Sequence, residues 1–65
     1  MHDYQLRVLK ECTELTEKIV KLEEFISGAI FKHLSSPEKD LLVAQHSAMR
    51  TYEDILNMRI DRFEK

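Results

Sequence analysis

Two apolar stripes with heptad spacing, separated by one short break, constrain this chain more than any other feature of its sequence. In the first stripe the intervals alternate between four and three residues, through Val8, Cys12, Leu15, Ile19, Leu22 and Ile26. The second shows the same alternation, through Leu42, Gln45, Met49, Tyr52, Leu56, Arg59 and Phe63. This spacing is typical of the seam through which one helix packs against another. The sequence therefore predicts an all-α fold, an antiparallel helical hairpin with helices at about residues 3–26 and about residues 37–64.

The connection, residues 27–36, is bounded by the only glycine and the only proline of the chain. We expect Gly28 to end the first helix, because glycine is common just past a helix C-terminus. Ser36 followed by Pro37 fits an N-cap with proline at the first helical position. Ser35 with Glu38 is a competing capping-box register. Both registers place the start of the second helix near residue 37.

The connection is too apolar for a free loop, because it contains Ile30, Phe31 and Leu34. We expect these residues to form one short helical turn that folds back over the closed end of the hairpin. The sequence shows no internal repeat, low-complexity tract or second domain. Residues 1–65 are therefore predicted to form a single helical-hairpin domain.

A hairpin of this length needs stabilisation beyond its own core. Chains below about 70 residues rarely gain more than a few kcal/mol from a single core and commonly need disulfides, metal or oligomerisation. Cys12 is the only cysteine, so no disulfide forms within the chain, and no group of histidine and cysteine has zinc spacing. Further apolar residues also flank both stripes. We therefore predict that the hairpins assemble into a homo-oligomeric helical bundle.

Charge and hydropathy exclude several classes of protein. Ten basic and twelve acidic residues give a formal net charge of −2, and the two signs alternate along both helices, which argues against binding to polymeric nucleic acid. No apolar run approaches the roughly 18 residues that a membrane span requires. Residues 1–5 lack the hydrophobic core of a signal peptide, and a single cysteine fits a reducing cytoplasm. The protein is expected to stay in the compartment where it is made.

The sequence contains no catalytic constellation. It has no HExxH motif, no glycine-rich phosphate loop, and no serine or cysteine obviously supplied with a histidine base. The three histidines, His2, His33 and His46, are scattered, and we expect them to face solvent. The sequence therefore predicts neither an enzyme nor a bound cofactor or metal.

The hairpin register determines which residues meet across the seam. A turn near residue 32 pairs positions whose numbers sum to about 67. The pairs in this register are Leu22 with Gln45, Leu15 with Tyr52, and Val8 with Arg59. It places Gln45 and Arg59 on an otherwise apolar seam, where an unpaired polar group costs about 1 to 3 kcal/mol. We interpret Gln45 as a register-fixing or internally bonded amide, although contact with a ligand remains open.

The open end of the hairpin combines cations with an aromatic ring. Arg59 is predicted to lie there together with Tyr4 and Arg7. Guanidinium groups bind phosphate oxygens bidentately, and an aromatic ring stacks on a nucleobase. The two arginines also fit an interface between subunits, in which they form ion pairs with Glu11 or Glu14. From the residues alone, a nucleotide or phosphate site and an oligomer interface both remain open.

A pattern of single residues across nearly the whole chain resembles a family of small bacteriophage proteins, the hairpin-domain family shared by anti-CBASS and Thoeris anti-defence sponges. The residues that carry the resemblance are Asp3-Tyr4-Gln5-Leu6-Arg7-Val8, Glu14-Leu15, Glu17-Lys18-Ile19, Leu22, Phe25, Leu34, Ser36-Pro37-Glu38, Leu41-Leu42, Gln45, Met49, Tyr52, Leu56 and Arg59-Ile60. This pattern is less specific than a metal or nucleotide fingerprint.

The resemblance implies a protein of the host bacterial cytoplasm that captures cyclic nucleotide immune signals without cleaving them. Members of the family form homo-oligomers, often hexamers, and bind cyclic dinucleotides in pockets between subunits. Some bind cyclic trinucleotides or cyclic ADP-ribose isomers. The family's base-stacking tyrosine corresponds to Tyr4, and its phosphate-binding lysine corresponds to Lys18, with Lys21 as an alternative one turn away. On chemical grounds we add Arg7 and Arg59 to the predicted ligand-binding residues.

Two other classes remain open. The first is a helical-bundle module that docks a host or phage protein, which would leave a large apolar patch exposed after self-assembly. The second is an RNA-binding hairpin dimer of the repressor-of-primer type, which the chain resembles in length and architecture. That role requires a basic face, whereas acidic residues interleave with the basic ones here. We rank it last.

Overall fold

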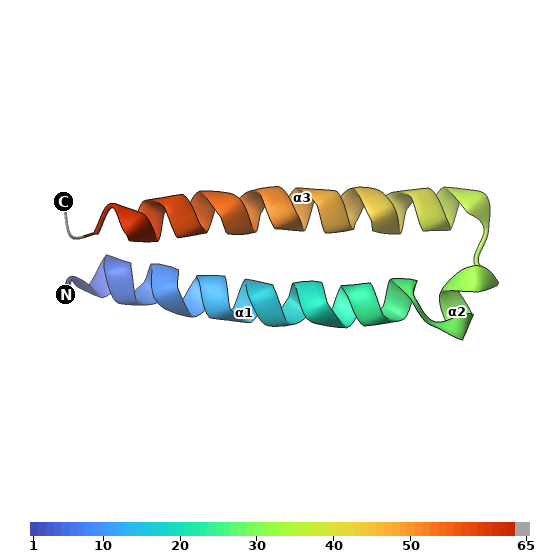
Figure 1. Ribbon diagram of the computed structural model, residues 1–65, viewed down its shortest axis with the longest axis horizontal. Helices are drawn as coiled ribbons and strands as arrows, with labels where there is room; N and C mark the ends of the chain where they lie inside the picture. The colour runs from blue at the N-terminus through green and yellow to red at the C-terminus, as the bar shows by residue number, and fades with distance from the viewer. Residues whose placement is uncertain (64–65) are drawn as a thin grey trace.

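The computed structural model describes residues 1–63 and confirms the helical hairpin. Helix α1 spans Asp3–Ile26, the short helix α2 spans Ala29–Lys32, and helix α3 spans Ser36–Asp61. The two long helices lie side by side and antiparallel, so that the start of α1 and the end of α3 are at one end and α2 is at the other (Figure 1). The molecule is a rod of 47 × 15 × 14 Å. No strand occurs within the described residues.

Helix α1 begins and ends through local hydrogen bonds. The His2 backbone N–H donates to the Gln5 side-chain oxygen at 2.9 Å, which gives the buried amide of Gln5 a partner. At the other end the Gly28 N–H bonds to the Phe25 carbonyl at 3.0 Å. Gly28 has φ of −91°, so the helix stops at Ile26 without the left-handed glycine that is common at such ends.

The start of α3 settles the capping register. Ser35 is the N-cap, and its side-chain oxygen accepts a hydrogen bond from the Glu38 backbone N–H at 3.4 Å. The alternative with Ser36 as N-cap is therefore wrong, and Pro37 occupies the second helical position, where its missing N–H is also harmless. The helix ends at Asp61 and not near residue 64, which lies outside the described residues.

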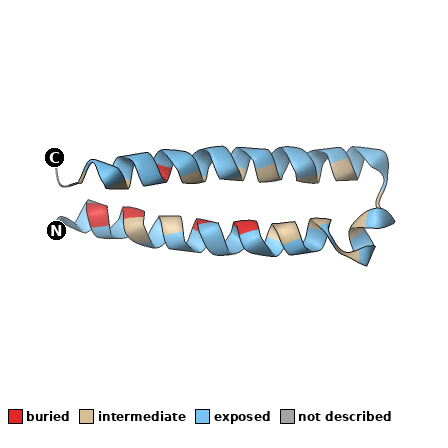
Figure 2. Cartoon of the chain, in the orientation of Figure 1, coloured by how far each residue is buried: buried red, intermediate tan, exposed pale blue. Residues whose placement is uncertain are grey.

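The core is a thin line of side chains between α1 and α3. Figure 2 shows the buried positions where the two long helices face each other. The buried apolar residues are Val8, Leu15, Ile19 and Leu56, and those packed against them are Cys12, Met49, Ile60 and Phe63. The α1 stripe predicted from the sequence is thus confirmed. Burial is confined to this line, so most of the surface of each helix is exposed.

The predicted rotation of α3 about its own axis is wrong by one position. The hydrogen-bonded side-chain pairs that join the helices are Cys12 with Asn57, Thr16 with Glu53 and Glu23 with His46, whose numbers each sum to 69, and Glu11 with Tyr52, whose numbers sum to 63. These sums lie on both sides of the predicted value of about 67. The seam of α3 keeps four predicted residues, Leu42, Met49, Leu56 and Phe63, but the intervening positions are His46, Glu53 and Ile60. Gln45, Tyr52 and Arg59 are exposed.

Hydrogen bonding explains why α3 turns two polar residues inward. Glu53 accepts a hydrogen bond from the Thr16 hydroxyl at 2.7 Å, and His46 Nε2 lies 2.8 Å from a Glu23 carboxylate oxygen. With partners on α1, these polar groups avoid the cost of unpaired burial. Rotation of α3 by one position also brings Ile60 toward the core.

Candidate functional site

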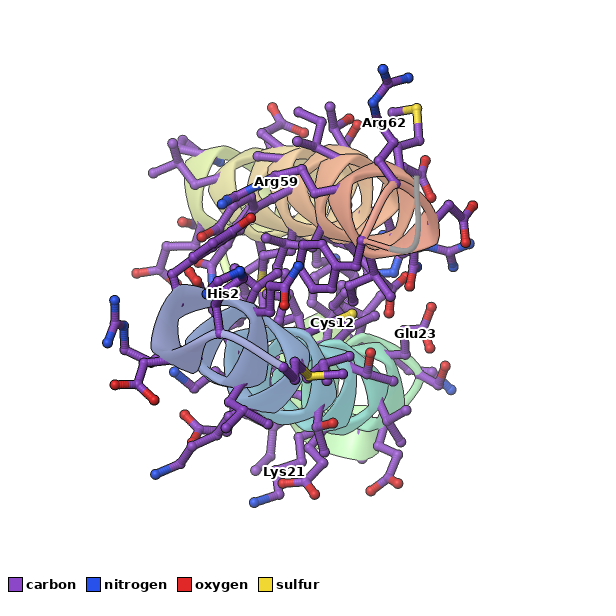
Figure 3. The ribbon with its side chains drawn as sticks, turned by 90° about the vertical axis from the view of Figure 1, so that its left-hand side faces the viewer. His2, Cys12, Lys21, Glu23, Arg59 and Arg62 are labelled. Carbon is purple, nitrogen blue, oxygen red and sulfur yellow. The ribbon has the colours of Figure 1, made fainter. Side chains whose placement is uncertain are left out.

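Rotation of α3 gathers a row of residues from each long helix onto one side of the hairpin. These residues lie one position before a seam residue, and they are Tyr4, Arg7, Glu11, Glu14, Lys18 and Phe25 on α1 and Leu41, Gln45, Ala48, Tyr52, Ile55 and Arg59 on α3. All are exposed. Lys21 and Arg62 also precede seam residues, but their side chains point away from the partner helix (Figure 3). The Tyr52 hydroxyl donates a hydrogen bond to the Glu11 carboxylate, which joins the two rows. We call this surface the Tyr4 face.

The opposite side of the hairpin carries the other cross-helix contacts. Arg59 and Glu23 point to opposite sides when the hairpin is viewed from its open end (Figure 3). We call the surface around Glu23, His46 and Arg50 the Glu23 face. The two faces differ in how their charged groups are paired. On the Glu23 face the carboxylate of Glu23 contacts both His46 and Arg50, whereas the cations of the Tyr4 face form no ion pair within residues 1–63.

Tyr4 lies in a small aromatic cluster at the open end. Its ring meets Phe63, which follows the end of α3, edge-on with centroids 6.0 Å apart, and it stacks on His2, also at 6.0 Å. Tyr4 remains 49% exposed. The ring is therefore held in place by its neighbours while part of it stays available to stack on a planar ligand.

All four predicted ligand-binding residues, Tyr4, Arg7, Lys18 and Arg59, lie on the Tyr4 face. Arg59 is exposed, so its predicted place on the seam was wrong, although it does lie toward the open end as expected. No ion pair joins Arg7, Lys18 or Arg59 to a carboxylate of residues 1–63. The structure places Lys21 on the side of α1 that faces away from α3 (Figure 3), so Lys18 is the lysine of this face.

One hairpin cannot bring all four residues to one small ligand. Tyr4 and Lys18 are four helical turns apart, about 21 Å along α1 at about 1.5 Å per residue. Arg7, in contrast, lies one turn from Tyr4, and Arg59 lies one turn from Phe63, which Tyr4 contacts. Tyr4, Arg7 and Arg59 thus belong to one end of the face, and Lys18 belongs to the other.

Sequence analysis missed two residues of this face, Glu11 and Tyr52. Tyr52 was predicted on the seam, but it is 41% exposed and bonded to Glu11. Glu11 was considered only as a salt-bridge partner. The signal that could have found them is spacing, since Glu11 continues the Tyr4, Arg7 and Lys18 row at intervals of three and four residues.

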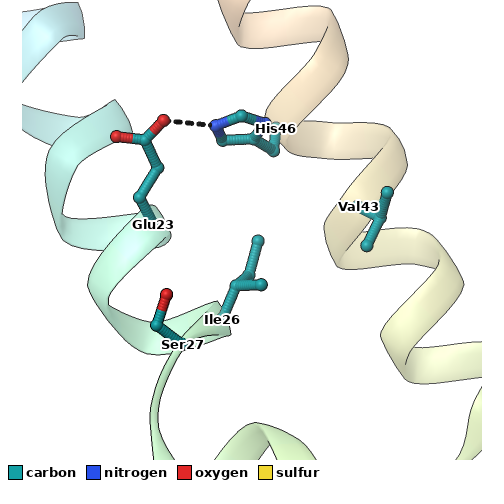
Figure 4. Close-up of a pocket in the computed structure, with 5 residues that line it drawn as sticks. All are labelled: Glu23, Ile26, Ser27, Val43 and His46. Carbon is teal, nitrogen blue, oxygen red and sulfur yellow. Dashed lines mark hydrogen bonds and ion pairs between the residues drawn. The ribbon is translucent and has the colours of Figure 1, made fainter.

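A second candidate site is an open pocket of about 420 Å³ at the closed end of the Glu23 face. Its lining is drawn in Figure 4 and consists of Glu23, Ile26, Ser27, Val43 and His46. His46 is partly buried against Glu23, so the expectation that it faces solvent was wrong. None of the predicted ligand-binding residues lines this pocket. Its one carboxylate is already engaged by His46 and, at 3.6 Å, by Arg50.

The described part of the chain contains no cluster of three or more acidic, histidine or cysteine side chains placed to hold a metal ion. None of its helices is long and apolar enough to cross a membrane.

Comparison with known proteins adds a family. The model of the Sequestin family matches residues 2–62. An uncharacterized 7.5 kDa protein from the denB-rIIB intergenic region of Enterobacteria phage T4 is 38% identical over 61 residues, which are 94% of this chain and 95% of that protein. No solved structure matches.

Proposed function

The chain belongs to the Sequestin family, and from this membership we propose that it is a phage anti-defence protein that sequesters cyclic oligonucleotide immune signals without cleaving them. The match confirms the family resemblance seen in the sequence, and the T4 relative supports a phage protein of this family. The proposed ligands are cyclic dinucleotides such as cyclic GMP-AMP, with cyclic trinucleotides and cyclic ADP-ribose isomers as further members of the class. The proposed site of action is the host bacterial cytoplasm.

The observation that carries the proposal is the gathering of Tyr4, Arg7, Lys18 and Arg59 on one exposed face. An aromatic ring with free surface suits a nucleobase, and unpaired cations suit phosphates. The three cations have no intramolecular partner among the described residues, so binding of a phosphate does not require an ion pair to be broken. The sequence supplies no group arranged for chemistry on a bound nucleotide, and sequestration requires none.

Self-assembly is part of the proposal. The Tyr4 face also exposes apolar groups, Leu41 at 71%, Ile55 at 45% and Tyr52 at 41%. A second copy that packs on this face covers them and brings its own Tyr4 and Lys18 to the interface. Because Tyr4 and Lys18 of one hairpin are about 21 Å apart, a ligand that contacts both takes them from different subunits. The family resemblance points to a hexamer.

Symmetry favours a cyclic ligand at such an interface. A cyclic dinucleotide has an approximate two-fold axis, and an isologous interface presents each side chain twice. One Tyr4 and one Lys18 can then serve each half of the ligand. Nanomolar affinity, about 12 kcal/mol, removes a signal stoichiometrically when the binder outnumbers it.

Isothermal titration of the purified protein tests the proposal. The panel is cyclic GMP-AMP, cyclic di-AMP, cyclic tri-AMP and cyclic ADP-ribose isomers, each followed by heat denaturation and chromatographic recovery of the ligand. Tight binding with intact recovery is the expected result. Absence of binding to every ligand overturns the proposal, and appearance of linear nucleotide overturns sequestration in favour of hydrolysis.

One alternative is supported by the same apolar groups. A face that exposes Leu41 and Ile55 also suits a helical-bundle module that docks another protein. Native mass spectrometry distinguishes protein docking from sequestration, because docking of another protein requires the Tyr4 face to remain free in the isolated protein. A homo-oligomer that buries the face and binds cyclic nucleotides contradicts it.

A further inference from the structure

Glu11 and Tyr52 occupy the middle of the Tyr4 face, and neither has a role in the binding scheme described above. Glu11 lies on the same row of α1 as Arg7, one turn or about 6 Å away along the helix. It lies two turns, about 10 Å, from both Tyr4 and Lys18. Tyr52 reaches it from α3. A ligand bound at the Tyr4 and Arg7 end of this face therefore lies beside a carboxylate.

A carboxylate repels a phosphate, so Glu11 must contact a different group of the ligand. Coulomb forces favour phosphates in contact with Arg7, Lys18 or Arg59 over phosphates in contact with Glu11. The remaining parts of a nucleotide are the ribose and the base. The group that a carboxylate binds best is a pair of adjacent N–H donors, which its two oxygens accept together.

Among the common nucleobases, guanine presents such a pair. The Watson–Crick edge of guanine offers N1–H and the N2 amino group side by side, and both are donors. Adenine offers one amino donor next to an acceptor nitrogen, which a carboxylate repels. A carboxylate that faces the base edge therefore discriminates guanine from adenine, because the wrong base leaves a buried acceptor without a donor.

The contact with Tyr52 gives Glu11 the fixed position that such discrimination requires. The Tyr52 hydroxyl donates to the Oε2 oxygen of Glu11. An ionised carboxylate accepts about four hydrogen bonds, so one bond from Tyr52 leaves Oε1 and part of Oε2 available. The bond holds the flexible Glu11 side chain against α3. Less conformational entropy is therefore lost when this side chain binds a ligand.

We propose that Glu11, positioned by Tyr52, reads the donor edge of guanine and gives the Tyr4 face a preference for guanine-containing cyclic dinucleotides. The proposal rests on the proposed function, because it assigns ligand chemistry to the same face. Glu11 is the residue that touches the base, and Tyr52 is a positioning residue.

The test compares two ligands of equal charge, cyclic di-GMP and cyclic di-AMP, by isothermal titration of the full-length protein. The expected ratio of dissociation constants favours the guanine ligand by about 10- to 100-fold, the strength of hydrogen bonds to a charged group. The Glu11→Gln variant should lose most of this ratio, since an amide replaces one acceptor by a donor. The Tyr52→Phe variant should reduce the ratio partly, because it removes the hydrogen bond that positions Glu11.

Glu14→Gln is the matched control. Glu14 lies one turn further along the same row and is exposed, and its one ion pair among the described residues is with Lys10 at 3.9 Å. Both substitutions remove one negative charge and so strengthen binding of any anionic ligand, but this effect cancels in the ratio. We expect Glu14→Gln to keep the guanine preference.

The outcomes separate this inference from the proposed function. If the wild-type protein binds both ligands equally, or if Glu11→Gln keeps the wild-type ratio, the guanine-reading role is wrong and sequestration stands. If neither ligand nor any other cyclic nucleotide binds, the proposed function and the inference are both overturned. Circular dichroism of each variant establishes that it is folded.

Discussion

His46 of α3 lies 2.8 Å from the carboxylate of Glu23 of α1, and this contact joins the two long helices near the closed end of the hairpin. Arg50, one turn further along α3, lies 3.6 Å from the same carboxylate. Two α3 side chains thus converge on one acidic group at the seam. The arrangement fixes the rotation of α3, and that rotation turns Gln45, Tyr52 and Arg59 toward the Tyr4 face.

Glu23→Ala should therefore destabilise the hairpin modestly. Glu23 is 44% exposed in its side chain, so solvent screening limits the loss to about 0.5 to 1 kcal/mol. Urea denaturation followed by circular dichroism measures it, at one fixed protein concentration because assembly shifts apparent stability. Glu24→Ala removes a neighbouring exposed carboxylate and should change the free energy of unfolding by less. Equal effects of the two substitutions would show that the contact does not stabilise the fold.

Leu56→Ala should have a much larger effect. Leu56 is fully buried, and truncation of a buried leucine costs about 2 to 5 kcal/mol through lost burial and the cavity left behind. A core this thin has little stability in reserve, so we expect loss of the cooperative thermal transition. Met58→Ala, at a position 58% exposed on the same helix, should stay within about 0.5 kcal/mol of wild type. A folded Leu56→Ala variant with an unchanged melting temperature would contradict the described core.

Tyr4→Ala should weaken binding of cyclic dinucleotides by about 1 to 3 kcal/mol, the value of one base stacked on one aromatic ring. Tyr4→Phe keeps the ring and its edge-on contact with Phe63, so its affinity should remain close to wild type. Titration calorimetry measures both variants. Unchanged affinity of the alanine variant would remove Tyr4 from the site, and an equal loss in both variants would show that the hydroxyl, and not the ring, makes the contact.

Most of the fold was predictable because its signal is local. Heptad spacing from Val8 to Ile26 fixes both the existence of α1 and its inner face, and the lone glycine and proline bound the connection. The rotation of α3 was not predictable in the same way. Leu42, Met49, Leu56 and Phe63 are common to both possible seams, and the choice between them depends on cross-helix hydrogen bonds to Thr16 and Glu23. No periodicity within one helix carries that information.

The residues of the candidate site also divide into those that the sequence indicates and those that only the packing of the helices reveals. Resemblance to a family suggested Tyr4 and Lys18, and chemistry suggested Arg7 and Arg59. Spacing places the three α1 residues on one row, but Arg59 could be assigned to the same face only when α3 was placed. Glu11 escaped notice because a single exposed carboxylate on a helix has no distinguishing pattern. Its contact with Tyr52 joins α1 to α3, so it is visible only in the tertiary structure. Lys18 and Lys21 were likewise indistinguishable by spacing until the direction of the Lys21 side chain was known.

Alanine substitution of Lys18 and of Lys21 tests whether the phosphate of the ligand binds to the Tyr4 face. Lys18→Ala should weaken binding of a cyclic dinucleotide about tenfold or more, because it removes a charge-assisted contact to phosphate. Lys21→Ala removes the same charge from the side of α1 that faces away from α3, so it should change affinity little. Added salt should weaken wild-type binding more than binding to Lys18→Ala. A larger loss in Lys21→Ala would place the phosphate on another surface of α1.

Assembly gives the last prediction, because the proposed site needs more than one hairpin. Ile55 is 45% exposed in the apolar row of the Tyr4 face, and Val43 is 53% exposed on the other side of α3. Glutamate at position 55 places a charge inside the proposed interface, where its desolvation is costly. Ile55→Glu should therefore dissociate the oligomer and weaken ligand binding, whereas Val43→Glu should do neither. Size-exclusion chromatography with light scattering measures the mass of each. A monomeric wild-type protein, or dissociation by Val43→Glu alone, would show that the Tyr4 face is not where the subunits meet.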